Sequence, residues 1–358
     1  MPNEIVLPLL FSFLITIIIT PLSLIFIKKL TLIDDPKTHK HPAILHTNPI
    51  PRGGGIPLFL GIFLAGIFFL PLTKVTIFLF FASFLALTVG SLDDKYDIVP
   101  YLRFGINVLC ALIVVGGGVG IPFITSPFGG IIHLDTYKWS FYFFGNHTIL
   151  FVSDAIAIIW TIWVMNMLNW SKGVDGQMPG IVAISAFVIG LLSLRFTPHD
   201  QLTLISSNIS FLITGASLGF LVYNFYPAKI LPGYGATSIY LLLAAVSILS
   251  GAKLATAILV MGVPMIDGIF TVLRRILSGR SPFWGDKKHL HHLLLQLGFN
   301  QQAVALFYWI ISAILGAIAL TLTSSQKIFA IVMLVVVAGA GLLFLHLTIN
   351  RKNEKNTL

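Results

Sequence analysis

Charged residues are scarce in this chain: Asp, Glu, Lys and Arg make up 10% of its 358 residues, whereas hydrophobic residues make up 56%. A soluble domain carries about 25% charged residues, so this composition excludes an ordinary soluble protein and predicts a polytopic membrane protein. Cysteine is almost absent. The single Cys110 lies in an apolar run, which excludes a disulfide framework and a cysteine metal site.

The N-terminus lacks the basic residues that begin a secretory signal peptide. It reads MPNE, and the apolar stretch that follows, 5–27, is longer than a signal-peptide core of about 7–15 residues. That length suits an uncleaved transmembrane helix of about 20 residues. The chain also lacks a basic stripe with interleaved aromatic residues. Its net charge of +9 therefore indicates contact with the lipid bilayer and no nucleic-acid partner.

Long apolar segments account for most of the sequence. They predict an all-α polytopic membrane protein with about eleven transmembrane helices, at 5–27, 54–72, 74–91, 101–121, 150–169, 179–196, 203–225, 234–250, 253–272, 303–323 and 327–349. We expect residues 1–350 to form a single integral-membrane domain and 351–358 a basic cytoplasmic tail. The long outer segment 122–149 predicts a short external β-hairpin.

The basic residues predict the orientation of these spans. With the N-terminus outside and the C-terminus inside, 17 of the 22 Lys and Arg fall on the inner side and 5 on the outer side. This distribution satisfies the positive-inside rule. It also brings five polar loops to the cytoplasmic face. The sequence favours a multi-pass protein of a bacterial plasma membrane.

Three carboxylates follow one of the apolar runs, in GSLDDKYD. On a helix, Asp94 and Asp97 share a face, and Asp93 also neighbours Asp97. Because an unpaired charge at the centre of a bilayer costs about 2.5–3.5 kcal/mol, the acids fit best at the cytoplasmic end of the span. They suit either a solvated helix end or a cluster that holds a divalent cation or takes a proton.

Two further loops carry polar groups. Asn166 and Asn169 are three residues apart on the last turn of a span, so that both amides point the same way, for ligand binding or for helix capping. Asp175 lies between two glycines, where the backbone can approach a ligand. The PRGGG segment at 51–55 fits either a phosphate-binding nest of backbone N–H groups or an ordinary turn between helices.

A late basic cluster contains three imidazoles in four positions: His289, His291 and His292. It is a poor zinc site, because His291 and His292 face apart on a helix and no cysteine is near. It is a good anion-binding loop, since His, Lys and Arg all bind phosphate oxygens. The alternative is a basic anchor that serves only the positive-inside rule.

Together these segments resemble the polyprenyl-phosphate N-acetylhexosamine-1-phosphate transferases over about residues 5–350. The similar segments occur in the family's order: IPRGGG, SLDDKYD, NMLNWSKGVDG, YNFYPAK, PMIDGIFTVLRR and SPFWGDKKHLHH. The HLHH form, with SPF before it, is closer to the GlcNAc-1-phosphate transferase branch than to phospho-MurNAc-pentapeptide translocase.

The resemblance implies transfer of a sugar 1-phosphate from a UDP-N-acetylhexosamine to a polyprenyl phosphate, with release of UMP. It also implies Mg²⁺ as cofactor, with Mn²⁺ as a substitute, and a homodimer. By resemblance, Asp93, Asp94 and Asp97 are catalytic, in deprotonation of the lipid phosphate or as a covalent aspartyl-phosphate. Asp94 and Asn169 bind the metal, and Asp175 binds the uracil. The remaining substrate-binding residues are Asn166, Lys172, Asn224, Asp267, Arg280, His289, His291 and His292.

The sequence departs from the family pattern at two positions. Gly233 stands, within one position, where the family has an aspartate that is a principal Mg²⁺ ligand, and the adjacent Tyr234 is a poor ligand when protonated. Lys172 replaces the first aspartate of the DGxDG motif. Either Lys172 pairs directly with a phosphate, or the chain is a degenerate member that only binds UDP-sugar or polyprenyl phosphate. A transporter fits less well, because no internal repeat is visible.

Overall fold

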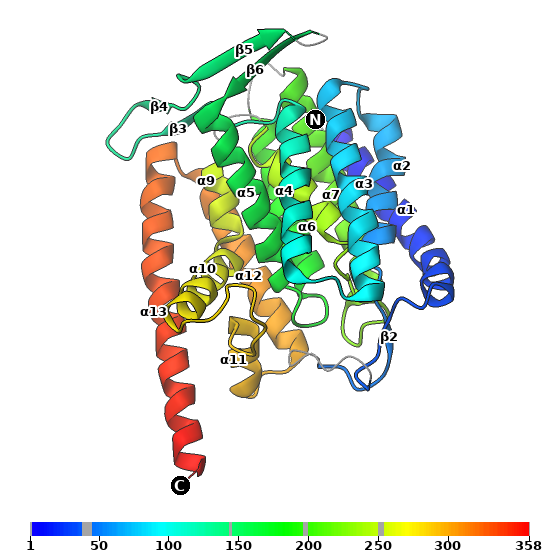
Figure 1. The fold of residues 1–358 in the computed structure, drawn as a ribbon, viewed down its shortest axis with the longest axis vertical. Helices are drawn as coiled ribbons and strands as arrows, with labels where there is room; N and C mark the ends of the chain where they lie inside the picture. Colours follow the sequence, from blue (N-terminus) through cyan, green and yellow to red (C-terminus); the bar gives the residue numbers. More distant parts are fainter. Residues whose placement is uncertain (1, 38–44, 143–144, 196–199, 250–253, 358) are drawn as a thin grey trace.

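A computed structural model describes residues 2–37, 45–142, 145–195, 200–249 and 254–357. This part of the chain is a bundle in which most of the long helices run side by side (Figure 1). The helices are α1 (Pro2–Lys29), α2 (Gly55–Phe69), α3 (Lys74–Tyr96), α4 (Pro100–Gly116), α5 (Phe151–Trp170), α6 (Gln177–Ser193), α7 (Gln201–Asn224), α8 (Thr237–Val246), α9 (Leu254–Val260), α10 (Gly262–Leu277), α11 (Leu290–Gln296), α12 (Gln301–Thr321) and α13 (Ser324–Thr357).

Helices that could cross a membrane dominate the fold, which confirms the prediction of an all-α polytopic membrane protein. In the described residues six helices are long and apolar enough, and the pair α9 and α10 makes a seventh if it counts as one span. Four predicted spans are shorter apolar helices of 10–17 residues: α2, α4, α6 and α8. The total of eleven spans therefore stays a prediction.

Two of the predicted segments differ in detail from the structure. The segment 253–272 is bent, because α9 and α10 meet at an angle of 82°. The outer segment 122–149 forms two antiparallel hairpins instead of one: β3 (Phe123–Thr125) with β4 (Ile131–His133), and β5 (Lys138–Tyr142) with β6 (Asn146–Leu150). The backbone of the predicted tail continues α13 as far as Thr357.

The start and end of α3 show how local sequence sets the position of the acidic motif. Thr73 caps the N-terminus, and its side chain and that of Thr76 each accept a hydrogen bond from the other residue's backbone N–H. The helix then runs through Tyr96, five residues beyond the predicted apolar span. It ends at Asp97, which has a left-handed backbone conformation with φ of 49°. The last turn of α3 thus carries Asp93 and Asp94.

The short helix α8 forms the centre of the bundle. Every residue from Thr237 to Val246 is buried. Helices α2, α3, α4, α5, α6 and α7 all contact it. An apolar helix buried all round belongs in the core of a large helical protein, and here its N-terminal end leads directly from the loop that contains Gly233.

The two ends of the bundle differ in character. The β3–β6 hairpins and the N-terminus lie at one end, whereas β2, α11 and the C-terminus lie at the other (Figure 1). At that second end, the first interhelical loop contributes the short ribbon β1 (Ile33–Asp34) and β2 (Ile50–Pro51). The polar loops predicted to share one face meet here.

Candidate active site

A pocket of about 1120 Å³ opens among the loops at this second end of the bundle. Its wall includes eight of the residues predicted from sequence: Asp97, Asn166, Asn169, Lys172, Asp175, His289, His291 and His292. They come from the end of α3, the end of α5, the loop after α5 and the segment entering α11. The fold therefore brings residues that are up to 195 positions apart in sequence into one pocket wall.

Five predicted residues do not line the pocket. Asp93, Asp94, Asn224 and Asp267 are buried beneath its wall. Arg280 is exposed outside it, and its guanidinium lies 5.7 Å from the centre of the Trp284 ring. The catalytic and substrate-binding roles expected of these five residues stay predictions.

Asp94 is enclosed by hydrogen-bond donors. Its Oδ1 atom accepts from Arg52 Nε at 2.8 Å and from the backbone N–H of Tyr234 at 2.7 Å. Its Oδ2 atom accepts from the Gly235 N–H at 3.3 Å. These donors replace the water that would otherwise solvate the buried carboxylate. Asp94 therefore joins α3 to the α7–α8 loop and fixes the Arg52 guanidinium at the pocket wall.

Asp93 binds a second arginine, Arg103, in the same way. Its Oδ2 atom accepts from Arg103 Nη1 at 3.2 Å, and its Oδ1 atom accepts from the Ile98 N–H at 3.0 Å. Asp97 follows the last helical residue, Tyr96, and has a left-handed backbone conformation. Asp97 lines the pocket as an exposed residue.

The glycine-rich turn before α2 packs against backbone instead of forming a phosphate nest. Its N–H groups are already used: Gly53 and Gly54 donate to the Leu231 carbonyl, and Gly55 donates to the Pro232 carbonyl. A Cβ atom on Gly55 would lie 2.2 Å from the Gly235 carbonyl carbon. The prediction of an ordinary turn between helices is the correct alternative, and it is this turn that delivers Arg52.

Lys172 lies against the α7–α8 loop. Its Nζ atom donates to the Gly233 carbonyl at 2.8 Å and lies 5.8 Å from the centre of the Tyr234 ring. Burial, reinforced by the nearby Arg52 guanidinium, lowers the pKa of Lys172 to about 7, although Asp94 and Asp93 act in the opposite direction. Arg103 lies 5.3 Å from the same tyrosine ring.

The amide and acid groups of the α5 region shape another part of the wall. Asn166 donates to the Ile162 carbonyl, whereas the Asn169 Oδ1 atom is buried with no hydrogen-bond partner among the described residues. Asp175 accepts from the Ala228 N–H at 2.9 Å. Asn224, beneath the wall, connects the loops, because it accepts from the Gly176 N–H and donates to the Ile230 carbonyl. These groups can orient a polar ligand that enters the pocket.

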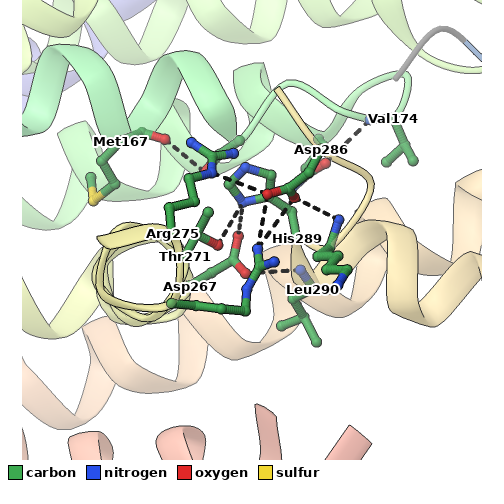
Figure 2. Close-up of polar contacts among 12 residues, drawn as sticks. Met167, Val174, Asp267, Thr271, Arg275, Asp286, His289 and Leu290 are labelled. Atoms are coloured by element: carbon green, nitrogen blue, oxygen red, sulfur yellow. Dashed lines mark hydrogen bonds and ion pairs between the residues drawn. The ribbon is translucent and has the colours of Figure 1, made fainter. Parts of the chain in front are cut away.

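Asp267 holds His289, the first imidazole of the cluster (Figure 2). The carboxylate accepts from His289 Nδ1 at 2.8 Å through Oδ2 and from the Leu290 N–H at 2.8 Å through Oδ1. The His289 and His291 rings are parallel within 7°, with centroids 5.6 Å apart. Glycine is required at 173, because a Cβ atom there would lie 1.9 Å from His291 Nε2.

Burial reduces the positive charge that His291 and His292 can present to an anion. It lowers the pKa of His292 to about 4, with help from His289 and Lys287. It lowers the pKa of His291 well below its usual value, with help from His292 and His289. Both rings are therefore neutral at pH 7 and can each donate only one hydrogen bond. The positive charge of the pocket comes from Lys172, Lys229 and the arginines.

Sequence reasoning missed several pocket residues, notably Arg52, Arg103, Arg275 and Asp286. Asp286 binds Arg275 Nε at 3.1 Å (Figure 2). Burial opposes the charge of Asp286, but the Lys288 N–H and the Arg275 guanidinium hold its pKa below the usual range. The presence of Arg52 in the turn motif was a usable signal. No spacing rule links Arg52 or Arg103 to the acids of α3, because their pairing depends on tertiary packing.

Comparison with known proteins decides the family. A family model described as glycosyl transferase family 4 matches residues 76–251. A Mycobacterium tuberculosis protein named decaprenyl-phosphate N-acetylglucosaminephosphotransferase is 32% identical over 337 residues, which cover 84% of this chain and 79% of the relative. The chain belongs to glycosyl transferase family 4.

Two further relatives cover still more of the chain. A Bacillus subtilis protein named as a probable undecaprenyl-phosphate N-acetylglucosaminyl 1-phosphate transferase is 27% identical over 93% of this chain and 90% of its own length. An Escherichia coli undecaprenyl-phosphate alpha-N-acetylglucosaminyl 1-phosphate transferase is 27% identical over 88% of this chain and 83% of its own length. The likeness to this glycosyl transferase family thus extends well beyond the segment matched by the family model.

Proposed function

We propose that this protein transfers N-acetylglucosamine 1-phosphate from a UDP-activated sugar to a polyprenyl phosphate and releases UMP. One observation carries the proposal: a pocket of about 1120 Å³ at one end of a membrane-helix bundle is lined by Arg52, Arg103 and Lys172. Such a pocket can hold several phosphate charges at the level where a lipid headgroup lies. The names of the relatives support GlcNAc as the sugar and a polyprenyl phosphate as the acceptor.

The reaction is a phosphoryl transfer in which the protein contributes position and charge. An oxygen of the lipid phosphate attacks the phosphorus that carries the sugar, and a new diphosphate bond forms. The bond from that phosphorus to the bridging oxygen breaks, and its electron pair leaves with UMP. The lipid phosphate is largely a dianion at pH 7, since its second pKa is about 6, so little proton removal is needed.

The described side chains suggest a division of work around this transfer. Arg52 and Arg103, held by Asp94 and Asp93, supply fixed positive charge. Asp94 and Asp93 would act here as positioning residues. Asp175, in its tight loop, lines the pocket, and we assign it to recognition of the uracil. The neutral imidazoles of the His289 cluster can donate hydrogen bonds to sugar or phosphate oxygens.

The expected orientation, with eleven spans, the N-terminus outside and the active site on the cytoplasmic face of the plasma membrane, belongs to this proposal. Two features support it. The termini lie at opposite ends of the bundle, as an odd number of spans requires (Figure 1). Most of the 22 Lys and Arg lie in segments assigned to the pocket side, although Lys40 and Lys253 fall outside the described residues. The homodimer stays a prediction of the resemblance.

Mg²⁺ also stays a prediction, and the described residues fit it poorly. Mg²⁺ favours octahedral coordination by carboxylate, phosphate and water oxygens. Both oxygens of Asp94 already accept from Arg52 or backbone N–H groups. Among the described residues no group of three or more His, Cys, Asp or Glu side chains could hold a metal ion. The unpartnered Oδ1 of Asn169 suits a cation or a donor, but one amide oxygen does not make a site.

The test is direct transfer of label from tritiated UDP-GlcNAc to undecaprenyl phosphate by the purified protein. We expect labelled lipid and an equal amount of UMP. Asp94→Asn should abolish turnover, because a neutral amide no longer fixes Arg52 by charge. UDP-GlcNAc binding without labelled lipid under any condition would refute the transfer and leave a protein that only binds the donor.

A further inference from the structure

The two departures from the family pattern contact each other in the structure. The Lys172 ammonium donates to the carbonyl of Gly233, and the same ammonium lies beside the Tyr234 ring. The lysine that replaces one expected aspartate is therefore fixed by the carbonyl of Gly233, which lies within one position of the other expected aspartate. The two changes are therefore coupled: the site has neither of the two expected carboxylates, and it contains a lysine whose ammonium is bound by a backbone carbonyl.

Gly233 cannot be exchanged for an acid while Asp94 keeps its position. Its φ is +67°, a conformation that favours glycine. A Cβ atom at this position would also lie 2.1 Å from Asp94 Oδ2. The hydrogen bonds that hold Asp94 thus require a residue without a Cβ atom at position 233. The loop presents the Gly233 carbonyl oxygen to Lys172.

The charges around this contact favour an anion over a metal ion. Arg52 and Arg103 are paired with the buried carboxylates of Asp94 and Asp93. Within the described ranges, Lys172 forms no ion pair, and its ammonium has three donors of which one is used by the Gly233 carbonyl. The remaining donors, beside two arginines in the pocket wall, suit a diphosphate.

We propose that Lys172, anchored by the Gly233 carbonyl, binds the diphosphate of the donor together with Arg52 and Arg103, so that transfer needs no divalent cation. The inference rests on the proposed function for the identity of the donor. The bond changes are those given above. The ammonium neutralises charge on the diphosphate and on the departing UMP oxygen. It forms no covalent bond with either substrate.

The decisive measurement compares the full-length protein in EDTA and in millimolar Mg²⁺. Two readouts are taken: transfer of label to undecaprenyl phosphate, and equilibrium binding of UDP-GlcNAc. We expect both to agree within about twofold in the two buffers. A loss of transfer and binding of tenfold or more in EDTA, restored by Mg²⁺, would overturn the inference and leave the proposed transferase function intact.

Variants then test the residue itself in EDTA. Loss of one charge-assisted hydrogen bond is worth about 1.5–3 kcal/mol, so Lys172→Met should bind UDP-GlcNAc about 10- to 100-fold more weakly. Lys172→Arg should recover most of that loss. Lys95→Met is the matched control, because Lys95 is exposed in the last turn of α3 and does not line the pocket. Equal binding by Lys172→Met and Lys95→Met would contradict the assignment.

The binding readout separates the two proposals. If no labelled lipid forms in either buffer, the transferase function fails, and the inference is judged on binding alone. Binding in EDTA that Lys172→Met weakens would still support a metal-free diphosphate site. Binding that appears only with Mg²⁺ would refute it.

Discussion

The Arg52–Asp94 ion pair gives the sharpest prediction about stability. It joins the turn before α2 to the end of α3, with Arg52 Nε 2.8 Å from Asp94 Oδ1. The Asp94 side chain is fully buried, whereas 23% of the Arg52 side chain is exposed. Arg52→Met keeps an unbranched apolar stem but leaves the carboxylate with only the backbone donors of Tyr234 and Gly235.

The size of the effect follows from burial. Removal of one partner of a buried pair costs about 3–5 kcal/mol, because it strands a charge. The partial exposure of Arg52 places the expected loss near the lower limit, about 3 kcal/mol. With an unfolding entropy of about 2.1 cal/mol/K per residue, 358 residues give about 0.75 kcal/mol/K, and Tm should fall by about 4 °C.

Thermal unfolding of the purified protein in one detergent measures this shift. Arg280→Met is the control, since it removes an exposed arginine and should change Tm by less than about 1 °C. Arg52→Met combined with Asp94→Asn removes the stranded charge and should recover part of the loss. The reasoning is refuted if Arg52→Met matches the control, or if the double variant loses the sum of the two single effects.

Three other perturbations test the rest of the site. Gly173→Ala should displace the His291 ring and lower kcat/KM at least about tenfold with little change in Tm, because its Cβ would lie 1.9 Å from His291 Nε2. Asp267→Ala strands the donors of His289 and Leu290 and should cost about 1–3 kcal/mol of unfolding free energy for each, whereas Asp267→Asn, which keeps an acceptor, should cost less on a thermal melt. Burial lowers the pKa of Lys172 to about 7, and its charged form exists below that value, so kcat/KM should fall as the pH rises from 7 to 9. Lys172→Arg, which stays charged, should remove that dependence, and an unchanged pH profile in this variant would contradict the role of the ammonium.

The helices were predictable because a bilayer imposes a simple pattern. Backbone groups in hydrocarbon must be satisfied within the segment, so each long apolar run becomes a helix. A continuous apolar pattern does not indicate where a helix breaks, and for this reason the break between α9 and α10 was not predicted. Apolar residues continue through Met261 and Gly262 without a change of pattern, and Pro264 is tolerated in the first turn of the new helix. Composition indicates that a segment is apolar, but not where it bends.

The site was predictable where loops share a face and less so where side chains pair. Sorting the basic residues brought Asn169, Asp175 and the His289 cluster to one end, and all of them line the pocket. The same sorting could not show that Asp94 binds Arg52, 42 positions earlier in the chain. Ion pairs over such separations are set by packing of α2, α3 and the α7–α8 loop, which no local spacing encodes.

The position of the acidic motif explains how a membrane bundle can bind anions with so few charges. Asp93 and Asp94 end α3 just beneath the pocket wall, where α8 and the glycine turn exclude water. In that setting each carboxylate holds an arginine whose other donors remain available to the pocket. The side chain at 172 then adds to, or offsets, the charge that these arginines bring to the wall. An acid at that position would favour a cation, whereas the lysine adds a donor for the diphosphate oxygens that we propose it binds.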